Sequence, residues 1–83
     1  MDTIARTPKQ IGAVLRRCRR QRGLTQAELG ARMSARQATV SKLEAGEPAT
    51  QLRTLMDALA ALDLELVIQP RNKAPSADIE ALF

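Results

Sequence analysis

The sequence has few of the residue types that catalysis and metal binding require. Among its 83 residues there is no histidine and one cysteine, Cys18, so neither an internal disulfide nor a zinc site is expected. Cys18 falls on an apolar helical stripe, which predicts a buried core thiol. A glycine-rich phosphate loop and a nucleophile paired with a base are also missing. We therefore expect a protein that is not an enzyme and that uses no cofactor or metal.

Aromatic residues and long apolar runs are scarce as well. The only aromatic residue is Phe83, which argues against binding of single-stranded nucleic acid, because base stacking needs aromatic platforms. No apolar run is long enough for a transmembrane helix, and the first residues lack the apolar core of a signal peptide. The lack of disulfides suits a reducing compartment. These absences predict a soluble cytoplasmic protein that does not bind a membrane.

Positive charge is present in excess and is unevenly distributed. The formal net charge is +4, and residues 1–24 hold seven lysines and arginines against one aspartate. Such an asymmetry suggests a polyanionic partner. On charge alone, a solvated basic helix face explains the pattern equally well.

Apolar periodicity and capping signals predict four helices. Thr25 and Glu28 have the spacing of a capping box, in which each side chain bonds the other's backbone N–H. Ser34 and Gln37 have the same spacing, but that arrangement competes with Gln37 pointing outward. The expected helices cover approximately residues 8–22, 25–33, 36–45 and 50–62. The core stripe expected for the last helix consists of Leu52, Leu55, Met56, Leu59 and Leu62.

Over residues 64–69 the spacing of the inward-facing apolar residues changes from that of a helix to every second residue. This alternation predicts one short strand ending at Pro70. A lone strand leaves its backbone donors and acceptors unpaired, so we expect it to pair with the same strand of a second copy in a two-fold homodimer. The alternative is an extension of the preceding helix or a frayed tail. We expect a domain over residues 1–70 and a flexible tail over 71–83. The predicted dimer-strand residues are Leu64, Leu66, Val67 and Ile68.

Two short helices joined by a tight turn between Thr25 and Ala45 form a helix-turn-helix, whose second helix enters the major groove of duplex DNA. The outward side of that second helix is rich in side chains that pair with base edges or phosphates. The predicted base-contacting residues are Arg36, Gln37, Ala38, Thr39 and Ser41. The predicted phosphate contacts from the residues alone are Arg16, Arg19, Arg20 and Lys42.

The stretches Gly23–Met33 and Gln37–Gly46 resemble the Xre/Cro class of helix-turn-helix domains. The resemblance implies an all-α, lambda repressor-like bundle of four to five helices, to which the residue pattern adds the one C-terminal strand that pairs across a homodimer. It also implies that Gln26 binds phosphate and that Glu44 is structural. Ser34 departs from the class, which usually has glycine at this place in the turn.

The segment Leu52–Leu62, followed by Leu64–Pro70 and a short tail, resembles the HipB-like antitoxins of type II toxin–antitoxin systems. This resemblance implies a homodimeric repressor that binds operator DNA in its own promoter. It further implies a partner, a HipA-like serine/threonine kinase toxin held inactive in the complex.

Two alternatives to the antitoxin stay open at this stage. One is a freestanding transcriptional regulator of the same fold with no toxin. The other is a protein-interaction adaptor that does not bind DNA. The adaptor is disfavoured because the outward face of the third helix lacks the apolar anchors that protein interfaces favour.

Overall fold

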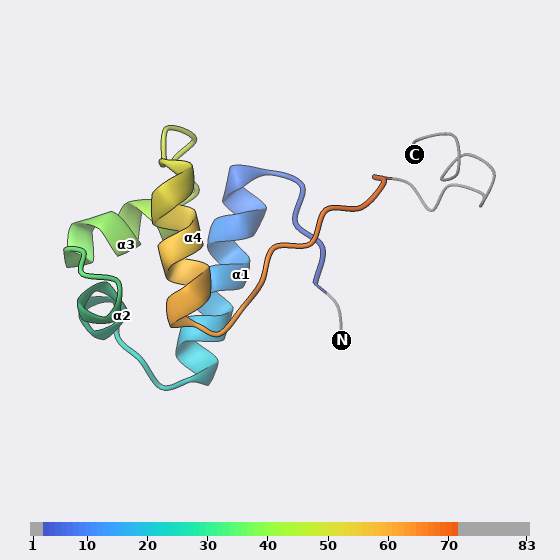
Figure 1. The fold of residues 1–83 in the computed structure, drawn as a ribbon. Helices are drawn as coiled ribbons and strands as arrows, with labels where there is room; N and C mark the ends of the chain where they lie inside the picture. The colour runs from blue at the N-terminus through green and yellow to red at the C-terminus, as the bar shows by residue number, and fades with distance from the viewer. Residues whose placement is uncertain (1–2, 72–83) are drawn as a thin grey trace.

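The computed structural model describes residues 3–71, which form four α-helices and no β-strand (Figure 1). The predicted all-α helix-turn-helix bundle is confirmed, with helix ends within about two residues of the expected ones. The helices are α1 (Pro8–Gln21), α2 (Gln26–Arg32), α3 (Gln37–Glu44) and α4 (Leu52–Ala61). None of the helices in the described range is long and apolar enough to cross a membrane.

The capping box at the start of α2 forms as predicted. The Thr25 hydroxyl accepts from the Glu28 backbone N–H at 3.1 Å, and the Glu28 carboxylate accepts from the Thr25 backbone N–H at 2.9 Å. The donation from the Thr25 backbone N–H lowers the pKa of Glu28 below its ordinary value. Two of the N–H groups that a helix start leaves without partners are satisfied in this way, so α2 begins at a defined residue.

All four helices contribute to one apolar core, with Leu15 from α1, Leu29 from α2, Val40 and Leu43 from α3, and Ala58 and Leu59 from α4. The stripe predicted for α4 is only partly correct, because Leu52 and Met56 are 67% and 45% exposed. The expectation of a buried thiol is likewise too strong, since Cys18 is half-buried at the edge of the core. The buried apolar residues are Leu15, Leu24, Leu29, Met33, Val40, Leu43, Ala58, Leu59 and Leu62.

Helix α1 approaches the end of α3 very closely at Gly12. A Cβ atom added there would lie 2.5 Å from the carbonyl oxygen of Glu44 and 2.7 Å from that of Leu43. Only glycine permits this approach, because a side chain would collide with backbone that cannot move aside. The Gly12 side of α1 is therefore held directly against the C-terminal end of α3.

The turn between α2 and α3 contains a residue in the left-handed backbone region. Ser34 has φ of 56°, and the next residue, Ala35, donates its N–H to the carbonyl of Gly30 at 2.8 Å. A side chain in this region costs about 1–2 kcal/mol, which explains why the Xre/Cro class usually has glycine there.

Replacing Ser34 with glycine is expected to raise the free energy of unfolding by about 1 kcal/mol, because it removes this backbone strain. Urea denaturation followed by circular dichroism measures the change. Ser41→Gly, in the interior of α3 at an ordinary helical position, is the matched control and is expected to destabilise the protein. Equal losses in both variants would contradict the assignment of strain to Ser34.

Residues 63–70 run past α1 beside the N-terminal segment without regular secondary structure in the single chain (Figure 1). Leu64 packs against the core, whereas Leu66, Val67 and Ile68 are 50%, 67% and 90% exposed. Their pairing with a second copy stays a prediction. Apart from Arg71, the predicted tail lies outside the described residues.

Candidate nucleic-acid interface

Helix α3 has a buried side and a polar exposed side, as its sequence predicts. Val40, Leu43 and Glu44 are buried against α1 and α2. Of the six residues predicted to face DNA from this helix and its cap, five are exposed and Thr39 is half-buried. The exposed residues are Arg36, Gln37, Ala38, Ser41 and Lys42. The outward side of α3 is therefore open to a partner.

The start of α3 decides between the two arrangements left open for Gln37. Arg36 is the N-cap residue of α3, and no side chain makes a capping hydrogen bond at this end of the helix. Ser34 and Gln37 therefore do not form a capping box. Gln37 is the first residue of α3 and is exposed, so its amide is available to pair with adenine N6 and N7.

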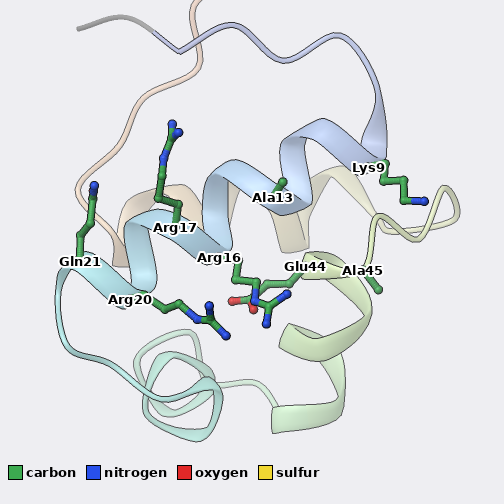
Figure 2. Close-up of a pocket in the computed structure, with 8 residues that line it drawn as sticks. All are labelled: Lys9, Ala13, Arg16, Arg17, Arg20, Gln21, Glu44 and Ala45. Atoms are coloured by element: carbon green, nitrogen blue, oxygen red, sulfur yellow. The ribbon is translucent and has the colours of Figure 1, made fainter.

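A groove rich in cationic side chains lies between α1 and the end of α3 (Figure 2). We call it the basic groove. Arg16 and Arg20 extend from α1 toward the end of α3, and Lys9 lies near Ala45 at the other end of the groove (Figure 2). The groove is lined by Lys9, Ala13, Arg16, Arg17, Arg20, Gln21, Glu44 and Ala45.

The basic groove continues the exposed face of α3. Gln37, Ser41 and Ala45 follow at intervals of four residues, so they lie along one side of the helix and its C-terminal end, and Ala45 also lines the groove. Hydrogen-bonding side chains thus lead directly into a strip of positive charge. This arrangement is complementary to duplex DNA, which has base edges in its groove and phosphates along the border of the groove.

The sequence analysis did not identify Lys9 as a residue of the basic groove. Its spacing of seven residues from Arg16 and eleven from Arg20 places it on the same side of α1, and this periodicity was available in the sequence. Arg16 and Arg20 are exposed, as predicted. Whether these residues contact phosphate stays a prediction.

The expectation that Arg19 is an exposed phosphate contact is wrong about its exposure, since the residue is only 7% exposed. Its guanidinium donates to both carboxylate oxygens of Glu44, at 2.6 and 3.1 Å, and to the carbonyl of Leu24 at 2.7 Å. The Glu44 carboxylate raises the pKa of Arg19. We therefore leave Arg19 out of the phosphate contacts and assign it, with Glu44, to holding α1 against α3.

Gln26, at the start of α2, is half-buried beside this ion pair. Its side-chain nitrogen donates to the Glu44 carboxylate at 3.2 Å. The structural role that the family resemblance implies for Glu44 matches these contacts. The phosphate contact implied for Gln26 stays a prediction. Within residues 3–71 there is no group of side chains that could hold a metal ion.

Comparison of the sequence with known proteins places it among DNA-binding regulators. A family model described as a helix-turn-helix domain matches residues 10–67. The antitoxin HipB of Escherichia coli O6:H1 is 32% identical over 72 residues, which cover 86% of this chain and 77% of that protein. An uncharacterized HTH-type transcriptional regulator of Sinorhizobium fredii is 37% identical over 62 residues, which cover 75% of this chain but 32% of that protein.

Solved structures similar to this chain include HipB complexes. One, described as a HipB-O4 20mer complex, matches with a TM-score of 0.80 and 28% identity over 86% of this chain and all of that one. Another, described as a HipA-HipB-O2-O3 complex, matches with a TM-score of 0.79 and the same identity, again over 86% of this chain and all of that one.

Proposed function

Because this chain belongs to the helix-turn-helix family of DNA-binding regulators and is a HipB-like antitoxin by similarity, we propose that it represses its own operon and neutralises a HipA-like kinase toxin. The proposal has three parts, which are operator binding, dimerisation and capture of a toxin. Each part is supported by a different observation and is tested separately.

Operator binding is supported above all by the continuous surface formed by the exposed face of α3 and the basic groove. In the proposed complex, α3 lies in the major groove, with Gln37 and Ser41 toward base edges and Arg36, Ala38 and Thr39 beside them. Lys9, Arg16, Arg20, Gln26 and Lys42 contact phosphates. In a dimer, two copies of α3 would enter successive major grooves about 34 Å apart.

Replacing Arg16 with alanine is expected to weaken binding to all duplexes alike and to lower the salt slope of the affinity by about 1, because one phosphate contact is lost. Fluorescence anisotropy at several salt concentrations measures both quantities. Arg53→Ala, which removes an exposed arginine of α4 outside the basic groove, is the control. An equal slope for Arg16→Ala and the unaltered protein would contradict a phosphate contact.

Autorepression is tested by footprinting the purified protein on the DNA upstream of its own gene. We expect two protected half-sites related by two-fold symmetry and separated by about one helical turn. Protection elsewhere in the genome with none at this upstream region would favour a regulator of other genes. The Sinorhizobium fredii protein to which this chain is similar is described as a transcriptional regulator, the general class to which this second candidate belongs.

Dimerisation is supported by the row of exposed apolar residues after α4. We propose that residues 1–70 form a DNA-binding and dimerisation unit, in which Leu64, Leu66, Val67 and Ile68 pair with the same residues of a second copy. Exposed apolar side chains on an extended segment with unpaired backbone groups are typical of such an edge.

Replacing Ile68 with lysine is expected to raise the dissociation constant of the dimer at least about tenfold, because the interface would lose a large apolar side chain and would bury a charge in its place. Sedimentation equilibrium measures the constant. Leu52→Lys introduces the same charge at an exposed apolar site on α4 and is expected to leave the dimer intact. Equal dissociation constants for both variants would contradict pairing through residues 64–69.

Capture of a toxin is supported by the similarity to HipB, which has been solved together with HipA. Co-expression of this chain with the product of the adjacent gene tests this part. We expect a stable complex and loss of the kinase activity of that product. An adjacent gene that encodes no kinase, together with operator binding by this chain alone, would favour the freestanding regulator.

A further inference from the structure

The two helices of the helix-turn-helix, α2 and α3, are joined to each other at two places. At one end, the turn over residues 33–36 joins the last residue of α2 to the first residue of α3. At the other end, Gln26 is the first residue of α2 and Glu44 is the last residue of α3, and their side chains are hydrogen-bonded at 3.2 Å. We propose that Glu44 is a positioning residue for DNA, which holds the Gln26 amide in place for a phosphate while it orients α2 against α3.

Glu44 can do this because its carboxylate is itself held rigidly. Its side chain is only 3% exposed, and both of its oxygens accept from Arg19. Arg19 in turn donates to the carbonyl of Leu24, in the loop that leads to α2. The carboxylate is therefore bonded to α1 and to the start of α2, and Arg19 connects it to the loop before α2. No buried side-chain nitrogen or oxygen in the described part of the chain lacks a hydrogen-bond partner.

The chemistry of the two groups determines how the Gln26 amide is turned. An ionised carboxylate only accepts hydrogen bonds, so the amide must present its nitrogen to Glu44 and cannot present its oxygen. The amide nitrogen carries two hydrogens, and one of them is used in this bond. The second remains a donor, which is the group that a phosphate oxygen requires.

This inference rests on the proposed operator binding. It predicts that removing the charge of Glu44 lowers the affinity for DNA, whereas electrostatics alone predicts a higher affinity. Glu44→Gln raises the net charge by one, which by itself strengthens binding to a polyanion. If Glu44 positions Gln26, the same change weakens binding, because a glutamine no longer obliges the Gln26 amide to present its nitrogen. Glu47→Gln, an exposed site in the loop after α3, makes the same change of charge without touching Gln26 and is the control.

A double-mutant cycle separates this role from a merely structural one. The probe is a duplex selected by the unaltered protein from a random-sequence library, and affinities are measured at a temperature where circular dichroism shows every variant folded. We expect Glu44→Gln and Gln26→Ala each to weaken binding about tenfold, and the double variant to lie within about twofold of Gln26→Ala. Glu47→Gln is expected to bind as tightly as the unaltered protein or more tightly.

The results that overturn the inference are distinct from those that overturn operator binding. Losses that multiply to about a hundredfold in the double variant overturn the inference alone, because they show that Glu44 does not act through Gln26. If the unaltered protein selects no duplex, the proposed operator binding is overturned and the inference with it.

A second measurement needs neither DNA nor a Glu44 variant, which covers the case in which Glu44→Gln does not fold. In the nuclear magnetic resonance spectrum of the unaltered protein, one side-chain N–H of Gln26 is expected to exchange with solvent more slowly than those of the exposed Gln51. Equal exchange for the two glutamines would overturn the inference.

Discussion

Replacing Arg19 with methionine is expected to lower the free energy of unfolding by about 3 kcal/mol. The methionine fills much of the same volume but leaves the carboxylate of Glu44 buried without its cation. The carbonyl of Leu24 also loses its donor. Removing one partner of a buried pair is costly because the remaining charge stays out of water without compensation.

Urea denaturation at a fixed protein concentration measures this loss, since the proposed dimerisation would make the stability depend on concentration. Arg16→Met, on the exposed side of the same helix, is the control and is expected to change the stability by no more than about 0.5 kcal/mol. Similar stabilities for the two variants would show that the ion pair does not hold α1 against α3.

Replacing Gln37 with alanine is expected to cost about 1–3 kcal/mol of binding free energy at one base pair of the operator and to relax the preference there. The exposed amide at the first position of α3 can make two hydrogen bonds to adenine, which alanine cannot replace. The loss is therefore confined to the duplex that carries the preferred base.

Affinities for a set of duplexes with single base-pair substitutions measure this effect. Arg16→Ala is the matched comparison, because loss of a phosphate contact lowers all affinities by the same factor and leaves the preference unchanged. An unchanged preference profile for Gln37→Ala would show that Gln37 does not contact a base.

Much of the fold was predictable because its signals are local in the sequence. The capping box of Thr25 and Glu28 lies within four consecutive residues, and the apolar stripe of α1 spans two turns. Local spacing was also enough to predict that Ser41 would be exposed on α3, since Val40 and Leu43 must face the core, but it left Gln37 open between a capping role and an outward side chain.

Predictions failed where burial depends on residues distant in the sequence. Arg19 looked like its exposed neighbours Arg16 and Arg20, because nothing within a few residues shows that Glu44, 25 residues away, will be its partner. The stripe of α4 likewise predicted a core role for Leu52 and Met56, but the other helices do not reach these residues, which stay exposed.

The amino-acid sequence by itself determined four helices, the helix-turn-helix and its polar exposed face, because hydrogen bonds and periodicity between near neighbours encode them. Only the tertiary structure decided which arginine is buried, that α1 lies against the end of α3 at Gly12, and that Gln26 meets Glu44. These contacts form when helices pack, since backbone approach and the pairing of buried charges depend on atoms brought together from distant parts of the chain.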